Sequence, residues 1–180
     1  MTKAFFPFLA TLALAGCSPS SAALPVGAQA PDFTTQATLA GKPFAFHLAD
    51  ALKKGPVVLY FYPAAFTSGC TVEAHDFAAA TDRFHALGAT VIGVSRDPIA
   101  TLNRFSVTEC RNRFAVASAD GKLVDAYHVK LPLLAKSNRT SFVIAPDGKI
   151  LFEYSALDPA GHVDKTMAAV QQWRAQHPAG

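Results

Sequence analysis

The chain has 180 residues, of which 51% are hydrophobic and 16% are charged, and its formal net charge is +3. This composition is typical of a single globular domain and excludes an intrinsically disordered chain. The positive charge is too small and too evenly spread to indicate nucleic-acid binding, so no nucleic-acid partner is expected.

The first residues predict an export signal. Lys3 precedes a short apolar segment over residues 4–13, which is too short for a membrane-spanning helix and has the form of a secretory signal. The segment ends in Leu14-Ala15-Gly16-Cys17, which resembles the lipobox of bacterial lipoproteins, where cleavage precedes a lipid-modified cysteine. The alternative for Cys17 is an ordinary thiol just after a conventional cleavage site.

We therefore expect a signal peptide over residues 1–16, a small-residue tether over 17–23 and one domain over 24–180. The protein is expected to be exported to the periplasm and to contact the membrane only through the lipid anchor at Cys17. Ser18, in place of an aspartate, favours the outer membrane by the same resemblance.

The first half of the domain shows strand and helix patterns in turn. After an extended segment at residues 31–33, residues 42–47 alternate as a strand does, and residues 57–62 are an apolar run typical of a buried strand. A helix is predicted from Thr71 to Leu87, with Gly88 as its stop. Its apolar face is expected to hold Val72, Phe77, Ala80, Phe84 and Leu87.

The second half continues this alternation and ends with a hairpin and a helix. Asp97-Pro98 is a helix-start signal, and Asp147-Gly148 predicts a tight hairpin turn. This order predicts an α/β fold with a mixed central sheet flanked by helices, and it matches the thioredoxin fold. The expected strands cover 90–94, 114–117, 140–144 and 150–154, and the expected helices 98–109, 120–127 and 161–175.

Cys70 lies where the strand 57–62, a proline-bearing loop and the start of a helix meet. A thiol in the first turn of a helix faces the positive end of the helix dipole and unpaired backbone N–H groups, which favour the thiolate. Because the thiolate is the reactive form of cysteine, the position predicts sulfur chemistry, and an inert buried thiol is the alternative.

Pro63, Thr67 and Cys70 have the spacing of the peroxiredoxin active-site pattern. The wider string over residues 61–77 resembles the PrxQ (bacterioferritin comigratory protein) branch, and the likeness runs from about Gly27 to Trp173. The resemblance implies a thioredoxin-like fold and a thiol-dependent peroxidase that reduces hydrogen peroxide or organic hydroperoxides. No cofactor and no metal are expected.

The chemistry assigns a role to each residue of the pattern. Cys70 would attack the peroxide and become a sulfenic acid. The Thr67 hydroxyl would bind the peroxide, and Pro63, which has no N–H group, would shield the thiolate from water. Arg139 would stabilise the thiolate and the charge that develops on oxygen, and Glu73 would hold the arginine.

Each of the four supporting residues also has a structural alternative. Thr67 is a possible helix cap, Pro63 a strand terminator and Arg139 a surface charge. Glu73 is placed where a carboxylate complements the helix dipole.

The chain departs from the family at His75, which stands where many members of the branch carry a resolving cysteine. Cys110 is the remaining candidate for that role, and Arg111 and Arg113 beside it would favour its thiolate. The alternative is that Cys110 is a half-buried thiol and that Cys70 works in a one-cysteine cycle.

Two further points follow from the resemblance. The reductant is expected to be a thioredoxin-like protein or a small thiol, and the protein a monomer or weak dimer. A different class of function stays open: a non-catalytic thioredoxin-fold envelope lipoprotein that senses oxidants or binds a partner.

Overall fold

The computed structural model describes residues 22–178 of the chain. The predicted signal peptide, the lipidation residue Cys17 and most of the tether lie outside these residues. Within them, no helix is both long enough and apolar enough to cross a membrane. Ala23 and Leu24, at the start of the described chain, pack against the core, and the Leu24 amide donates to the carbonyl of Tyr127 (3.4 Å).

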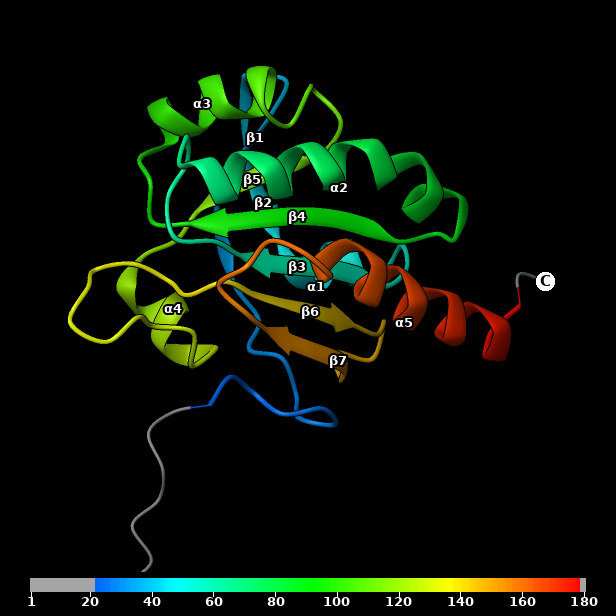
Figure 1. Ribbon diagram of the computed structural model, residues 1–180. Coiled ribbons are helices and arrows are strands. Elements are labelled where there is room, and N and C mark those ends of the chain that lie inside the picture. The colour runs from blue at the N-terminus through cyan, green and yellow to red at the C-terminus, as the bar shows by residue number, and fades with distance from the viewer. Residues whose placement is uncertain (1–21, 179–180) are drawn as a thin grey trace, which may run out of the picture.

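The centre of the molecule is one sheet with the strand order β2-β1-β5-β4-β3-β6-β7 (Figure 1). The strands span Thr34–Leu39 (β1), Lys42–His47 (β2), Val57–Phe61 (β3), Thr90–Ser95 (β4), Ala115–Ser118 (β5), Thr140–Ile144 (β6) and Ile150–Ser155 (β7). β4 is parallel to both of its neighbours, β3 and β5, and the other pairs are antiparallel. The predicted mixed sheet is thereby confirmed.

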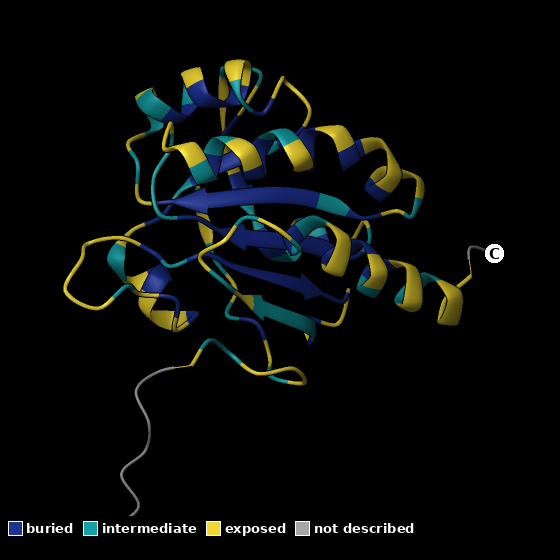
Figure 2. Ribbon diagram, in the orientation of Figure 1, coloured by how far each residue is buried: buried dark blue, intermediate teal, exposed yellow. Residues whose placement is uncertain are grey.

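Helices cover both faces of this sheet. They span Leu48–Leu52 (α1), Ser68–Ala86 (α2), Ile99–Thr108 (α3), Gly121–Ala126 (α4) and His162–Gln176 (α5). α2, α3 and α5 pack with Val58 and Tyr60 of β3, whereas α1 and α4 pack with Leu59 and Phe61. Because side chains alternate along a strand, β3 serves both cores, and its residues are all buried (Figure 2).

Most elements lie where the sequence predicts them, including the end of the helix that carries Cys70. Gly88, with φ +76, follows α2 in the left-handed conformation, and the Ala89 amide closes the turn on the carbonyl of Phe84 (2.9 Å). The hairpin turn at Asp147-Gly148 is also confirmed, with Gly148 at φ +83.

Two expectations about the helices differ from the structure. The sequence did not predict α1, because five residues are too short for a periodic pattern to stand out. The placement of Val72 on the buried face of α2 is wrong, since this side chain is 48% exposed. Residues 72 and 77 are five apart and point in different directions on a helix of 3.6 residues per turn; Glu73 and Ala74 fill the buried face instead.

His47 links the start of α1 to the segment before β1, and it makes stability depend on pH. Its ring nitrogens lie 2.8 Å from Asp32 Oδ2 and 3.0 Å from Asp50 Oδ2. The hydrogen bond to Asp32, followed by that to Asp50, raises the pKa of His47 above its usual value of 6.5. The protonated ring therefore stabilises the fold below the unfolded-state pKa, and this contribution is lost as pH rises through the folded-state pKa.

The variant His47→Gln tests this linkage. We expect the stability difference between parent and variant to be largest at about pH 5 and to shrink steadily toward about pH 9. Urea unfolding at several pH values measures that difference. A difference that stays constant across the range would contradict the linkage.

Candidate active site

The loop between β3 and α2 is held in place by the end of the neighbouring strand β4. The amide of Ala65 donates to Asp97 Oδ2 at 2.7 Å. The Ser95 hydroxyl donates to the same oxygen, also at 2.7 Å, and Ser95 is fully buried. Residues 63–67 are thereby fixed relative to the sheet, although the loop itself has no regular structure.

Thr67 occupies the N-cap position of α2, but its side chain does not cap the helix. Its hydroxyl donates back to the carbonyl of Ala64 (2.9 Å), so it stays within the loop and is exposed. Pro63 is partly buried at the start of the same loop. Phe66 takes a left-handed φ of 63 and packs edge-on against Phe105 of α3.

Cys70 lies in the first turn of α2, as the sequence predicts, and it is only 1% exposed. Arg139 comes from the segment just before β6, which is the other neighbour of β3. Its Nη2 lies 3.4 Å from the Cys70 Sγ. Because the guanidinium is charged at every physiological pH, this contact places a fixed positive charge beside the sulfur.

Glu73, one turn after Cys70, forms a buried ion pair with Nη1 of Arg139. The Nε of Arg139 donates to the carbonyl of Leu157 (2.9 Å), so its three nitrogens have three different partners and its orientation is fixed. Burial raises the pKa of Glu73 to about 8, and the charge of Arg139 opposes this rise. The arginine therefore favours the ionised carboxylate against the effect of burial, and the carboxylate holds the arginine in place.

His162 extends this cluster and was not predicted from the sequence. Burial lowers the pKa of His162 to about 4, so the ring is neutral near pH 7. Its Nε2 lies 3.0 Å from the carbonyl of Ala156, which places the proton there, and Nδ1 then accepts from the Ser141 hydroxyl (2.8 Å). The same Nδ1 lies 3.7 Å from Glu73 Oε1, which has no hydrogen-bond partner among the described residues.

Gly69 is the residue that lets Arg139 approach the first turn of α2. A Cβ at this position would lie 3.0 Å from Arg139 Nη2. If Cys70 reacts with peroxide, as the sequence resemblance implies, Gly69→Ala should displace the guanidinium from Cys70 and slow that reaction by about tenfold, while improving the local helix propensity. Measuring the peroxide-reduction rate and the urea midpoint of both proteins tests this. A variant with the parent's rate would contradict the proposed contact.

The environment of Cys110 differs from the two sequence expectations. Cys110 is fully buried rather than half-buried, and it follows the end of α3 in the same core cluster as Cys70. Burial raises the pKa of its thiol, and the nearby charge of Glu109 raises it further. The expectation that Arg111 and Arg113 favour its thiolate is wrong, because both are exposed and Arg113 pairs with Asp82 instead.

Cys70 and Cys110 are both free thiols in this structure. His75 points to the segment that carries Cys110. Its Nε2 lies 2.9 Å from Glu109 Oε2, so it joins α2 to the residue that precedes Cys110.

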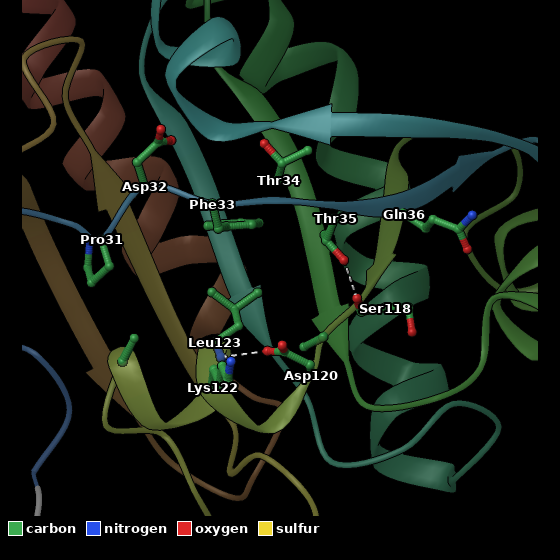
Figure 3. Close-up of a pocket in the computed structure, with 12 residues that line it drawn as sticks. Pro31, Asp32, Phe33, Thr34, Thr35, Gln36, Ser118, Asp120, Lys122 and Leu123 are labelled. Carbon is green, nitrogen blue, oxygen red and sulfur yellow. Dashed lines mark hydrogen bonds between the residues drawn. The ribbon is translucent and has the colours of Figure 1, made fainter.

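A cavity of about 570 Å³ lies elsewhere, between the start of β1, the end of β5 and α4 (Figure 3). Neither cysteine lines it. Two of its polar side chains have structural partners: the Thr35 hydroxyl donates to the carbonyl of Ser118, and Asp120 caps α4 by accepting from the Leu123 amide (2.8 Å). The cluster around Cys70 is therefore the better candidate for the active site.

The structure brings Cys70, Glu73 and Arg139 into contact, with Thr67 and Pro63 on the adjoining loop. Sequence reasoning missed the two supports of this cluster, Asp97 and His162. Asp97 was noticed only as a helix start, and His162 carries no local signal, because its neighbours come from distant strands and helices.

The fold and this cluster define a class: a thioredoxin-like protein with a buried cysteine, at the start of a helix, beside a fixed arginine. Residues 26–152 match the AhpC/TSA family. The chain is 31% identical over 127 residues to peroxiredoxin Bcp of Escherichia coli, covering 67% of this chain and 79% of that protein. It thus belongs to the AhpC/TSA family, and it is a peroxiredoxin of the kind that includes Bcp.

Solved structures agree with this assignment. The crystal structure of peroxidoxin BcpB from Mycobacterium tuberculosis superimposes with a TM-score of 0.75 at 33% identity, covering 82% of this chain and 96% of that chain. A cysteine-to-serine mutant of PrxQ from Xylella fastidiosa has a TM-score of 0.74 at 23% identity over 84% of this chain and 98% of that chain, which shows the shared fold.

Proposed function

We propose that this thiol-dependent peroxidase acts through Cys70 as its peroxidatic cysteine. The observation that carries the proposal is the contact between Cys70 and Arg139, with the guanidinium fixed by Glu73. A fixed positive charge beside a buried thiol would stabilise the thiolate, which is the form of cysteine that reacts. Hydrogen peroxide and organic hydroperoxides are the proposed substrates.

The reaction balances with these groups. The Cys70 thiolate gives an electron pair to one peroxide oxygen, the O–O bond breaks, and a sulfenic acid forms. The departing oxygen leaves as hydroxide or alkoxide and takes a proton to become water or an alcohol. Arg139 stabilises the charge that moves from sulfur to that oxygen. The Thr67 hydroxyl would bind the peroxide, and residues 63–67 are called the peroxide-binding loop below.

Pro63 and Glu73 have supporting roles in this proposal. Pro63 brings no N–H group to the loop, so it adds apolar cover without a competing donor. Glu73 acts through Arg139, and His162 acts through Glu73, so both are positioning residues. The non-catalytic alternative is not favoured, because the relatives are named as peroxiredoxins and the cluster is assembled.

The variants Cys70→Ser and Cys110→Ser test the assignment together. Peroxide consumption by the prereduced chain, with no added reductant, counts how many equivalents each protein removes. We expect Cys70→Ser to remove none and Cys110→Ser still to remove about one. Consumption by Cys70→Ser at the parent's rate would overturn the assignment.

The sulfenic acid on Cys70 can be reduced by either of two thiols, which gives two possible catalytic cycles. Either Cys110 attacks the sulfenic acid and a disulfide forms with loss of water, or an external thiol attacks it instead. The first route requires the chain around the two cysteines to rearrange until their sulfurs can bond, because both are free thiols in this structure and disulfide geometry is strict. An intact mass after one equivalent of peroxide decides: loss of two hydrogens means the Cys70–Cys110 disulfide, and gain of one oxygen means a one-cysteine cycle.

We also propose that the enzyme is exported and lipid-anchored at Cys17, with residues 24–180 as its domain. The support is the sequence alone, namely the signal-like segment and its Leu-Ala-Gly-Cys ending. A periplasmic thioredoxin-like protein or a small thiol would then be its reductant. Cys17→Ser should release the protein from the membrane fraction, measured by fractionation of expressing cells.

A further inference from the structure

The loop between α4 and β6 exposes apolar side chains to an unusual degree. Residues 130–136 read Lys-Leu-Pro-Leu-Leu-Ala-Lys and are called the leucine loop below. Leu133 is 104% exposed and Leu134 is 53% exposed. Figure 2 shows the loop as an exposed projection beside α4. Exposing two adjacent leucines to water does not stabilise the fold. Adjacent exposed apolar side chains indicate an interaction site.

The leucine loop is closed and held at its base. The Leu131 amide donates to the carbonyl of Lys136 (3.0 Å), and the Asn138 amide donates to the carbonyl of Val129 (2.6 Å). The Ser137 hydroxyl donates to the carbonyl of Tyr62 (2.8 Å), just before the peroxide-binding loop. The leucine loop therefore presents its leucines on a fixed base.

Two lysines flank the exposed leucines. Lys130 and Lys136 are both exposed at the base of the leucine loop, and Asp125 lies 3.7 Å from Lys130 Nζ. An apolar tip with cations behind it matches the cross-section of a bilayer, in which acyl chains lie beneath anionic headgroups. A protein partner would not require this order of apolar and basic residues.

The start of the described chain lies on the same side of the molecule. Leu24 is hydrogen-bonded to Tyr127 at the end of α4, and Figure 1 shows this start of the chain below α4 and the leucine loop. Leu24 lies seven positions after Cys17, and seven extended residues span at most about 25 Å. A lipid on Cys17 would therefore keep this face of the domain close to the membrane.

We propose that the leucine loop docks on an anionic phospholipid bilayer, with Leu133 and Leu134 inserted among the acyl chains and Lys130 and Lys136 at the headgroups. The inference gains support from the anchor proposed at Cys17 but does not require it. It fixes the orientation of the domain, whereas an anchor alone fixes only its distance from the membrane.

A tryptophan placed in the loop tests the insertion directly in the full chain. Trp173 is the one tryptophan of the sequence, so Trp173→Phe gives a silent background. In that background, Leu134→Trp should lose more than half of its fluorescence on vesicles of phosphatidylglycerol and phosphatidylethanolamine with brominated acyl chains. Val107→Trp, on the exposed face of α3, is the matched control and should stay unquenched. Equal quenching of the two tryptophans, or none at position 134, would overturn the proposal.

Serine substitutions separate the apolar and the electrostatic parts. Lys130→Ser with Lys136→Ser should reduce the quenching at position 134 on anionic vesicles by several-fold and change it little on neutral ones. Leu133→Ser should weaken the quenching on both kinds of vesicle.

A different outcome would assign the loop to another copy of the chain. In that case the fluorescence of the Leu134→Trp protein shifts to the blue with rising protein concentration, without lipid and without quenching by brominated lipid. That result would also overturn the proposal. None of these results bears on peroxide reduction by Cys70.

Discussion

Replacing Arg139 with lysine is expected to lower the rate constant for peroxide reduction by at least about 100-fold. Lysine keeps the charge but has one nitrogen, whereas the guanidinium reaches Cys70, Glu73 and the carbonyl of Leu157 with three. The ammonium therefore cannot be held beside the sulfur in the same orientation. Stopped-flow oxidation of the prereduced chain under single-turnover conditions measures the rate.

The matched control for this experiment is Arg83→Lys, an exposed arginine in the last turn of α2. Its rate should stay within about twofold of the parent, because surface substitutions away from a site have small effects. If Arg139→Lys also remained within about threefold of the parent, charge alone would suffice and the fixed orientation would have no catalytic role.

Glu73→Ala is expected to lower the free energy of unfolding by about 3 kcal/mol. The substitution leaves the guanidinium of Arg139 buried without its carboxylate, and breaking one side of a buried ion pair costs more than the pair itself contributes. Glu73→Gln should cost less, because the amide keeps the shape and one acceptor oxygen. Urea unfolding of the three proteins at the same pH measures the differences.

A double variant shows whether the unpaired charge causes this loss. Glu73→Ala combined with Arg139→Ala should be more stable than Glu73→Ala alone, since the stranded charge is gone. Asp76→Ala, an exposed position on the same helix, is the control and should change stability by less than about 0.5 kcal/mol. A Glu73→Ala variant as stable as Asp76→Ala would contradict a buried ion pair.

The elements that sequence reasoning located share one property: their signal lies within the element. The apolar run of β3, the left-handed Gly88 after α2 and the Asp147-Gly148 turn are each decided by a few consecutive residues. α1 has too few residues for such a signal. Val72 was misplaced because its apolar character was counted while its angular position on the helix was not.

For the candidate site, the motif predicted Cys70 and its neighbours along the chain, but not the groups that hold their surroundings. Asp97 supports the loop of residues 63–67 only because β4 lies beside β3, and His162 meets Glu73 only because α5 packs on α2. The thiol of Cys110 was judged from the adjacent arginines, whereas burial decides its ionisation. Contacts between distant segments are not visible in a single sequence.

The burial of Cys110 has a consequence for the energetics of electron transfer. Its reduced thiol is packed in the core with Tyr60 and Phe105, and a disulfide that draws the sulfur away from these side chains loses that packing. Any packing free energy lost when a disulfide forms raises the reduction potential of that disulfide, by about 30 mV for each 1.4 kcal/mol in a two-electron couple. A disulfide formed by Cys110 would therefore be a comparatively strong oxidant, which even a weak thiol reductant could restore to two free thiols.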